Sequence, residues 1–205
     1  MDKHIVRDLD TLHAIYGKPA APSLIKEVTY IHSLYRPWIE KAPFVVLATA
    51  GGGGLDVSPR GDKPGFVQIE DEKTLLLPDR RGNNRLDSLR NLIEDDRLAL
   101  LFLIPGAGEM LRINGRGEID IAPALLARFS HEGVLPRSVL RIQVESVYFQ
   151  CSRAALRSGL WQAESQIDRH QLPSPGAILK ALSRGDVDGA AYDALLPQRL
   201  KNTLY

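Results

Sequence analysis

The sequence predicts an α+β protein, mainly β, in which a small antiparallel β-barrel carries peripheral helices. Short strand-like runs separated by turn residues fill the middle of the chain, from Phe44 to Tyr148, and few of them are joined by helices. One of these runs, Met110–Ile121, alternates apolar and polar residues and contains two glycines, which is typical of a curved strand. Curved strands close small barrels, and the pattern predicts about six of them.

The first 40 residues or so are predicted to be helical. A first helix is expected over Leu9–Tyr16, because its apolar residues recur at helical spacing and Gly17 follows as a stop signal. A second helix is expected between Pro22 and Pro37, because its apolar residues share one face: Ile25, Val28, Ile31 and Tyr35.

Two hairpins are expected next. Phe44–Ala50 is the first strand and returns through the glycine turn Gly51–Gly54. The apolar runs Phe66–Ile69 and Thr74–Leu77 form the second hairpin around Asp71-Glu72.

Three longer strands complete the predicted barrel. Leu98–Ile104 is apolar throughout, which predicts a strand buried on both faces. Met110–Ile121 should turn four alternating side chains to the core: Leu111, Ile113, Ile119 and Ile121. Val139–Tyr148 is the last strand, and a break in its alternation predicts a bulge near Ser146.

Short helices are expected around these strands. Arg85–Glu94 should be a helix capped by Asn83 or Asn84, with its apolar side chains inward: Leu86, Leu89, Leu92 and Ile93. Ala122–Phe129 begins with Pro123 in its first turn, and the C-terminal stretch offers two more helices, Ala177–Ser183 and Gly189–Leu195. The chain is therefore expected to be one domain overall, with N-terminal helices packing on the barrel (1–42), the barrel (43–161) and a helical arm (162–205).

Composition excludes several classes of function. A formal net charge of +1 gives no global field that would draw the chain to nucleic acid or to an anionic membrane. The start of the sequence lacks the apolar core of a signal peptide, and the longest apolar run, Leu98–Ile104, is too short to span a bilayer, so a cytoplasmic protein is expected. Cys151 is the only cysteine and the five histidines are scattered, which predicts no disulfide and no metal site.

Two basic stretches are the most informative part of the sequence. The turns Ser58–Lys63 (SPRGDK) and Pro78–Arg85 (PDRRGNNR) bracket the second hairpin, so they can converge on one side of the sheet. Guanidinium groups, an amide-rich turn and a helix start are suited to holding a phosphate. The alternative is a pair of solvated surface loops. No nucleophile elbow and no glycine fingerprint for a dinucleotide is present, so the catalytic residues are unknown.

In order, the motifs of this chain resemble those of the pyridoxamine 5'-phosphate oxidase-like flavoproteins, the FMN-binding split β-barrels. The motifs are a strand at Phe44–Ala50, then SPRGDKPGF, LLLPDRRGNNRLDSL, a buried strand ending in IPG, LRINGRGEI and YFQCSRAALRSGLW. The likeness is strongest to a subgroup of FMN-dependent enzymes whose substrate is unassigned. It implies a six-stranded split barrel, and a homodimer with FMN at the subunit interface.

The resemblance also implies which residues contact FMN. Ser58, Pro59 and Arg60 would run along the flavin, and Pro78 and Asp79 would meet the ring. On electrostatic grounds, Arg60, Lys63 or Arg112 could stabilise the negative charge of the reduced flavin. The phosphate would lie on Asn83, Asn84 and Arg85. The residues expected to reach the flavin of the partner subunit, or to close over it from the tail, are Arg112, Asn114, Arg153 and Trp161. The C-terminal arginine and histidine signature with which the oxidase binds its substrate is not found.

Three functions follow as hypotheses. The first is an FMN-dependent oxidoreductase that acts on an unidentified small molecule, with electrons from a reduced nicotinamide or a similar donor. The second is a flavin-binding sensor, carrier or stress protein without dedicated turnover. The third is haem handling, although no histidine or cysteine is clearly placed as an axial ligand.

Overall fold

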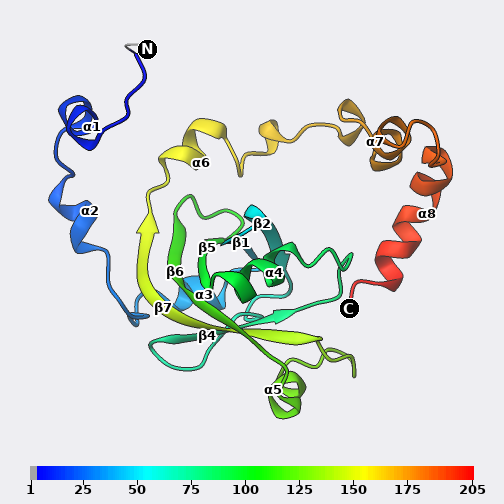
Figure 1. The fold of residues 1–205 in the computed structure, drawn as a ribbon, viewed down its shortest axis with the longest axis horizontal. Coiled ribbons are helices and arrows are strands. Elements are labelled where there is room, and N and C mark those ends of the chain that lie inside the picture. The colour runs from blue at the N-terminus through cyan, green and yellow to red at the C-terminus, as the bar shows by residue number, and fades with distance from the viewer. Residues whose placement is uncertain (1–3) are drawn as a thin grey trace.

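A single antiparallel sheet of seven strands organises the chain in the computed structural model, which describes residues 4–205 (Figure 1). The strand order is β2-β1-β5-β6-β7-β4-β3, and every pair is antiparallel. The strands are β1 (Phe44–Gly51), β2 (Gly54–Gly61), β3 (Gln68–Ile69), β4 (Thr74–Asp79), β5 (Arg97–Leu103), β6 (Met110–Asp120) and β7 (Ser138–Gln150). The predicted class and both predicted hairpins are confirmed. The sheet has one strand more than the six expected.

The sheet curls into a barrel that stays open between β2 and β4. β2 is one edge of the sheet and pairs with β1 alone. At the other edge the two-residue strand β3 pairs with Leu75 and Leu76 of β4, which leaves the end of β4 without a strand neighbour on that side. The ends of β2 and β4 therefore face a gap that backbone hydrogen bonds do not close, and side chains must span it.

The pairing of β6 with β7 is interrupted by a bulge. Asn114 pairs with Ser146 and Gly115 pairs with Val144, so β7 carries one extra residue at this point and the predicted bulge is confirmed. A Cβ at Gly115 would lie 2.2 Å from the carbonyl oxygen of Gln143. Gly115 therefore allows the close approach of the two strands that the bulge requires.

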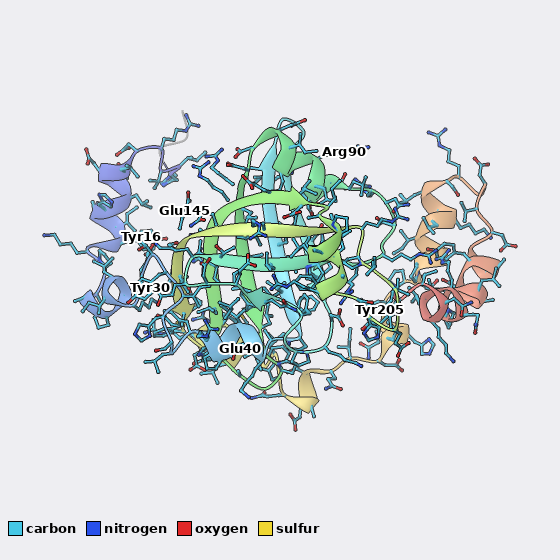
Figure 2. The ribbon with its side chains drawn as sticks, turned by 90° about the horizontal axis from the view of Figure 1, so that it is seen from below. Tyr16, Tyr30, Glu40, Arg90, Glu145 and Tyr205 are labelled. Carbon is cyan, nitrogen blue, oxygen red and sulfur yellow. The ribbon has the colours of Figure 1, made fainter. Side chains whose placement is uncertain are left out.

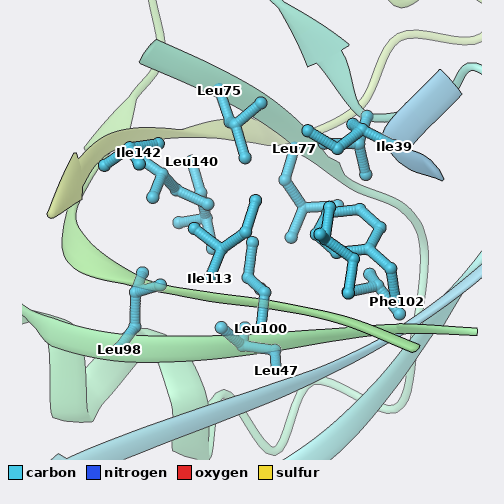
Figure 3. Close-up of a cluster of buried hydrophobic side chains, with 14 of the residues drawn as sticks. Ile39, Leu47, Leu75, Leu77, Leu98, Leu100, Phe102, Ile113, Leu140 and Ile142 are labelled. Atoms are coloured by element: carbon cyan, nitrogen blue, oxygen red, sulfur yellow. The ribbon is translucent and has the colours of Figure 1, made fainter. Parts of the chain in front are cut away.

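The core lies inside the curl and is built from alternating residues of the strands (Figure 3). Its largest fully buried side chains include Leu47, Leu75, Leu77, Leu100, Phe102, Ile113, Leu140 and Ile142. The expectation that Leu98–Ile104 is buried on both faces was wrong, because β5 alternates between fully and partly buried residues. Ile121 was also predicted to be buried, but it follows the end of β6 and is 68% exposed.

Before the barrel the helices differ from the prediction. The helix α1 (Leu9–Tyr16) is confirmed, but the second predicted helix stops early, as α2 (Ala21–Ile25), and Pro37 lies inside a further helix, α3 (Arg36–Glu40). Between α2 and α3 the backbone of Val28 exchanges two hydrogen bonds with Val147 on β7. Pairing with a strand therefore replaces the helix in this β-branched stretch.

The remaining helices lie around and beyond the sheet. They are α4 (Asp87–Glu94), α5 (Pro123–Arg128), α6 (Arg153–Ser158), α7 (Pro175–Leu182) and α8 (Gly189–Asn202), with short 3-10 turns at Ala163–Ser165 and Arg169–Gln171. Figure 2 shows α1 and α2 on one side of the sheet and α7 and α8 on the other. α1 and α2 bury no residue, whereas Ile39 of α3 is fully buried. Among the described residues, no helix combines the length and the apolar character needed to cross a bilayer.

The bulge yields a stability prediction. We expect Gly115→Ala to lower the free energy of unfolding by about 1–3 kcal/mol, because the new methyl group would collide with the backbone of β7. Gly53→Ala is the matched control, since a Cβ at that glycine would meet no atom within 4 Å. Urea unfolding of both variants measures the difference, and equal midpoints would show that β6 and β7 do not approach as described.

Candidate functional site

A pocket of about 630 Å³ opens where β2 and β4 end, in the gap of the open barrel. We call it the main pocket. Both basic stretches line it, so the structure brings together two segments that the sequence only suggested were neighbours. Eight of the predicted site residues contribute to its wall: Ser58, Pro59, Arg60, Pro78, Asp79, Asn83, Asn84 and Arg85.

The first wall is a polar face of β2. The basic pattern predicted a turn at Ser58, Pro59 and Arg60, but these residues lie in the strand β2. Alternation places Ser58 and Arg60 on the same side as Asp56. The Ser58 hydroxyl donates to the Asp56 carboxylate at 2.9 Å.

This face of β2 is connected to α4. The hydroxyl of Ser88 donates to Asp56 at 2.6 Å, and Arg60 donates to the same hydroxyl oxygen at 3.3 Å. The hydrogen bond from Ser88 is the main cause that lowers the pKa of Asp56. The sequence analysis missed Asp56 and Ser88. The sequence does contain a signal for each: Asp56 is four residues before Arg60 on the same face of a strand, and Ser88 is one helical turn after Arg85.

The second wall is the turn that leads into α4. Asn84 and Leu86 have φ of +61° and +63°, a conformation that non-glycine residues rarely adopt. The predicted asparagine cap was wrong, because Asn83 accepts from the N–H of Arg85 instead and the N-cap position is Leu86. No side chain caps α4, so the amide groups of its first turn are available to a ligand in the main pocket.

The inward face of α4 also differs from the prediction. Leu92 is buried, but Leu86 is 45% and Ile93 is 78% exposed. Ser88 and Asn91 are buried in their place. Asn91 donates to Thr49 on β1 at 3.2 Å, so polar contacts hold this helix against the sheet beside the pocket.

The main pocket carries a positive charge overall. Five arginines and three aspartates line it, which leaves a formal charge of +2; they are Arg60, Arg80, Arg81, Arg85 and Arg137 against Asp56, Asp79 and Asp87. Arg85 pairs with Asp87 at 2.6 Å while its side chain is 79% exposed. Such an exposed pair contributes little stability, so an anion can recruit Arg85 at small cost.

Asp79 is a partly buried carboxyl in the wall of the pocket, and its side chain is 19% exposed. Burial raises its pKa, against the opposing effect of Arg60, whose Nε lies 3.9 Å from the carboxylate, and of Arg137. Because Arg60 belongs to β2 and Asp79 to β4, this ion pair spans the gap in the barrel.

A second ion pair spans the same gap. Arg80 donates to Asp62 at 2.8 Å and to the carbonyl oxygen of Phe129 at 2.6 Å. The Asp62 side chain is only 4% exposed. Burial acts to raise its pKa, but the hydrogen bonds from the Tyr205 hydroxyl, the Lys63 N–H and Arg80 outweigh this effect and hold the pKa below its usual value.

Five predicted site residues do not line the main pocket. Lys63 is exposed on the turn after β2. Arg112 lies on β6 with its guanidinium 4.9 Å from the ring centroid of Tyr148, and Asn114 donates to Ser146 at 3.1 Å. Arg153 begins α6, and the Trp161 indole donates to the carbonyl oxygen of Ala107 at 2.6 Å. The expected roles of Arg112, Asn114, Arg153 and Trp161 concern a partner subunit or the tail, whereas Lys63 was expected to act as a cation near the flavin. All five roles stay predictions.

Within residues 4–205, no group of three or more histidine, cysteine or acidic side chains is arranged to hold a metal ion. The site chemistry that the main pocket offers is therefore that of guanidinium, amide, hydroxyl and carboxyl groups.

Comparison with known proteins gives a family match. A family model described as pyridoxamine 5'-phosphate oxidase matches residues 31–151, a stretch that contains all seven strands and most of the main pocket. No curated protein matches the chain.

Several solved structures are similar. HupZ from Group A Streptococcus is 17% identical, over 60% of this chain and 95% of that one, with a TM-score of 0.49. A Clostridium acetobutylicum protein related to general stress protein 26 of B. subtilis (pyridoxinephosphate oxidase family) is 15% identical over 57% and 84%, with a TM-score of 0.44. An FMN-binding protein from Syntrophomonas wolfei is 12% identical over 69% and 95%, with a TM-score of 0.42.

The Asp62–Arg80 pair yields a pH-dependent prediction. We expect Asp62→Asn to lower the free energy of unfolding at neutral pH by about 1–3 kcal/mol, because it removes the charge from a buried, multiply hydrogen-bonded carboxylate. The pKa of Asp62 is lower in the folded state, so its contribution is present above the unfolded pKa, near ~3.9, and is lost as pH falls through the folded value.

Unfolding curves collected from neutral to acidic pH check this expectation. The difference in free energy of unfolding between wild type and Asp62→Asn should become smaller toward acidic pH. The exposed residue Asp186 provides the control, since Asp186→Asn should leave stability unchanged. Equal free energies of unfolding for wild type and Asp62→Asn at neutral pH would contradict a stabilising role for the Asp62–Arg80 pair.

Proposed function

The chain belongs to the pyridoxamine 5'-phosphate oxidase family, and on that premise we propose that it binds FMN in the main pocket and acts as an oxidoreductase on a small molecule. The observation that carries the proposal is the pocket itself: a cavity of about 630 Å³ at the gap of the barrel, lined by five arginines and by the uncapped start of α4. A cavity of this volume is in the range of small-molecule and cofactor sites.

The residues at the start of α4 fit the phosphate of FMN. The free amide groups of the first turn, the exposed guanidinium of Arg85 and the side chain of Asn84 are hydrogen-bond donors on one side of the pocket. The formal charge of +2 in the lining complements a phosphate monoester, which carries close to two negative charges at neutral pH.

The apolar part of the lining fits an aromatic ring. Its lining includes the apolar side chains of Pro59, Phe66, Pro78, Leu89 and Leu204. When bound, FMN supplies hydride and single-electron transfer. Arg60 would hold a positive charge beside the ring, where it stabilises negative charge that develops on reduction, and Asp79 would orient the guanidinium.

We also propose that the working unit is a homodimer with FMN at the interface. The family resemblance assigns Arg112, Asn114, Arg153 and Trp161 to the second copy or to the closing tail, and all four lie outside the main pocket of one chain. A reduced nicotinamide or a similar compound would supply the electrons, and the substrate is a small molecule whose structure is unassigned.

A binding role without turnover is the second candidate. The observation that favours it is that each carboxylate of the pocket already has a partner: Asp79 pairs with Arg60, Asp87 pairs with Arg85, and Asp56 accepts from the hydroxyls of Ser58 and Ser88. In that case the chain would be a flavin-binding sensor or carrier.

The experiment that separates these functions is an absorbance measurement on the purified protein. A yellow protein whose flavin band is bleached anaerobically by a reduced nicotinamide supports the oxidoreductase. A yellow protein that is inert to all donors supports the sensor or carrier, and a Soret band in place of the flavin band would indicate haem.

The phosphate assignment predicts the effect of a single substitution. We expect Arg85→Ala to weaken FMN binding by about 1–3 kcal/mol, which is roughly 5- to 150-fold, while the fold is retained. Arg90→Ala is the matched control, because Arg90 is an exposed arginine on the same helix that does not line the pocket. Fluorescence titration of FMN measures both affinities, and an unchanged affinity in Arg85→Ala would place the phosphate elsewhere.

The dimer assignment has its own test. Arg112→Ala should weaken FMN binding only in a dimeric protein, since Arg112 does not line the main pocket of its own chain. Sedimentation analysis gives the oligomeric state and titration gives the affinity. A monomeric protein that loses FMN affinity on this substitution would overturn the proposed interface.

A further inference from the structure

Tyr205 contacts three separate segments beside the main pocket. Its hydroxyl donates to the carboxylate of Asp62 at 2.7 Å. Its ring stacks on His131, with centroids 3.8 Å apart and an interplanar angle of 18°, and the guanidinium of Arg80 lies 5.4 Å from the ring centroid. The tyrosine therefore joins the Asp62–Arg80 ion pair that spans the gap in the barrel.

These contacts return the chain to the barrel after a helical arm that stands apart from it. α7 and α8 pack on each other, with Gly176 and Gly189 in close backbone approach, and lie to the side of the sheet (Figures 1 and 2). Beyond α8, the Thr203 hydroxyl donates to the carbonyl oxygen of Arg199 at 2.8 Å. Of the next two residues, Leu204 reaches the main pocket and Tyr205 reaches a smaller cavity next to it. Figure 2 shows Tyr205 between the sheet and the arm.

The last two residues line two neighbouring cavities. Leu204 is 66% exposed and contributes its side chain to the main pocket. Tyr205 lines a smaller cavity of about 150 Å³, which shares Arg80, Arg81 and Arg137 with the main pocket. An exposed leucine gains a fixed position only if a neighbouring residue is anchored, and the ring and hydroxyl of Tyr205 provide that anchor.

We propose that Tyr205 is a positioning residue that holds Leu204 in the wall of the main pocket, so that docking of the tail and occupation of the pocket by FMN stabilise each other. The inference rests on the proposed function, because it takes FMN as the occupant. The mechanism is reciprocal linkage: a ligand that contacts Leu204 favours the docked tail, and the docked tail raises the affinity for the ligand by the same factor.

Three variants separate the anchor from the wall. Tyr205→Phe keeps the ring and removes the hydroxyl that donates to Asp62, Tyr205→Ala removes both, and Leu204→Ala removes the wall side chain but keeps the anchor. Tyr16→Ala is the control, since Tyr16 is 79% exposed on α1 at the far side of the sheet (Figure 2).

The first readout is the position of the tail. Arg199 and Lys201 precede the anchor by a few residues and are sites for trypsin. Cleavage at these sites should be faster in Tyr205→Ala than in wild type, intermediate in Tyr205→Phe and unchanged in Leu204→Ala and Tyr16→Ala. Equal rates of cleavage in wild type and Tyr205→Ala would overturn the anchor.

The second readout is the equilibrium dissociation constant of FMN. We expect this constant to rise roughly five- to tenfold in Tyr205→Ala and in Leu204→Ala, and FMN to protect the trypsin sites in wild type but not in Tyr205→Ala. Identical dissociation constants in all variants would overturn the linkage. If the wild-type chain binds no FMN but still resists trypsin at Arg199 and Lys201 more than Tyr205→Ala does, the proposed function is overturned. The anchoring role of Tyr205 is then retained.

Discussion

The gap between β2 and β4 is the constraint on which the rest of the structure depends. A fully closed barrel would pair these strands through their backbones, but the sheet ends in β2 on one side and in the two-residue strand β3 on the other. Two ion pairs, Arg60–Asp79 and Arg80–Asp62, span the gap in place of a hydrogen-bonded ladder. Because charged side chains are unfavourable in a dry interior, the opening must stay accessible to water or to a polar ligand.

That constraint explains why the pocket and its charge occur together. The curl of the sheet brings the C-terminal ends of β2 and β4 to one place, and the chain leaves each strand through a basic stretch. α4 begins at the same place with uncapped amide groups, after a turn in which Asn84 and Leu86 are held in a left-handed conformation. Such strain persists where surrounding contacts enforce it, and here it accompanies an anion-binding arrangement. Fold, charge and pocket thus have a single geometric origin.

Local patterns predicted a large part of this architecture. Alternation in Met110–Ile121 identified β6 and its core face, and the break in alternation identified the bulge opposite Gly115. Apolar periodicity predicted the wrong secondary structure where a long-range contact determines it. Val28 pairs with β7 and does not continue a helix. On α4, Ser88 and Asn91 are buried because they bind Asp56 and Thr49, which no helical pattern of apolar residues can indicate.

The residues of the candidate site also fall into those that the sequence could predict and those that it could not. Residues within the two basic stretches were predictable because a hairpin makes its flanks neighbours, whereas Arg137, Leu204 and Tyr205 come from distant parts of the chain and needed the fold to place them. The central claim is that the guanidinium and amide groups at the gap between β2 and β4 hold a phosphate. The most direct test compares the equilibrium binding of FMN and of riboflavin to the wild-type protein. The account predicts that FMN binds roughly 100-fold or more tightly than riboflavin, the equivalent of at least two charge-assisted hydrogen bonds. Equal affinity for the two flavins would contradict it.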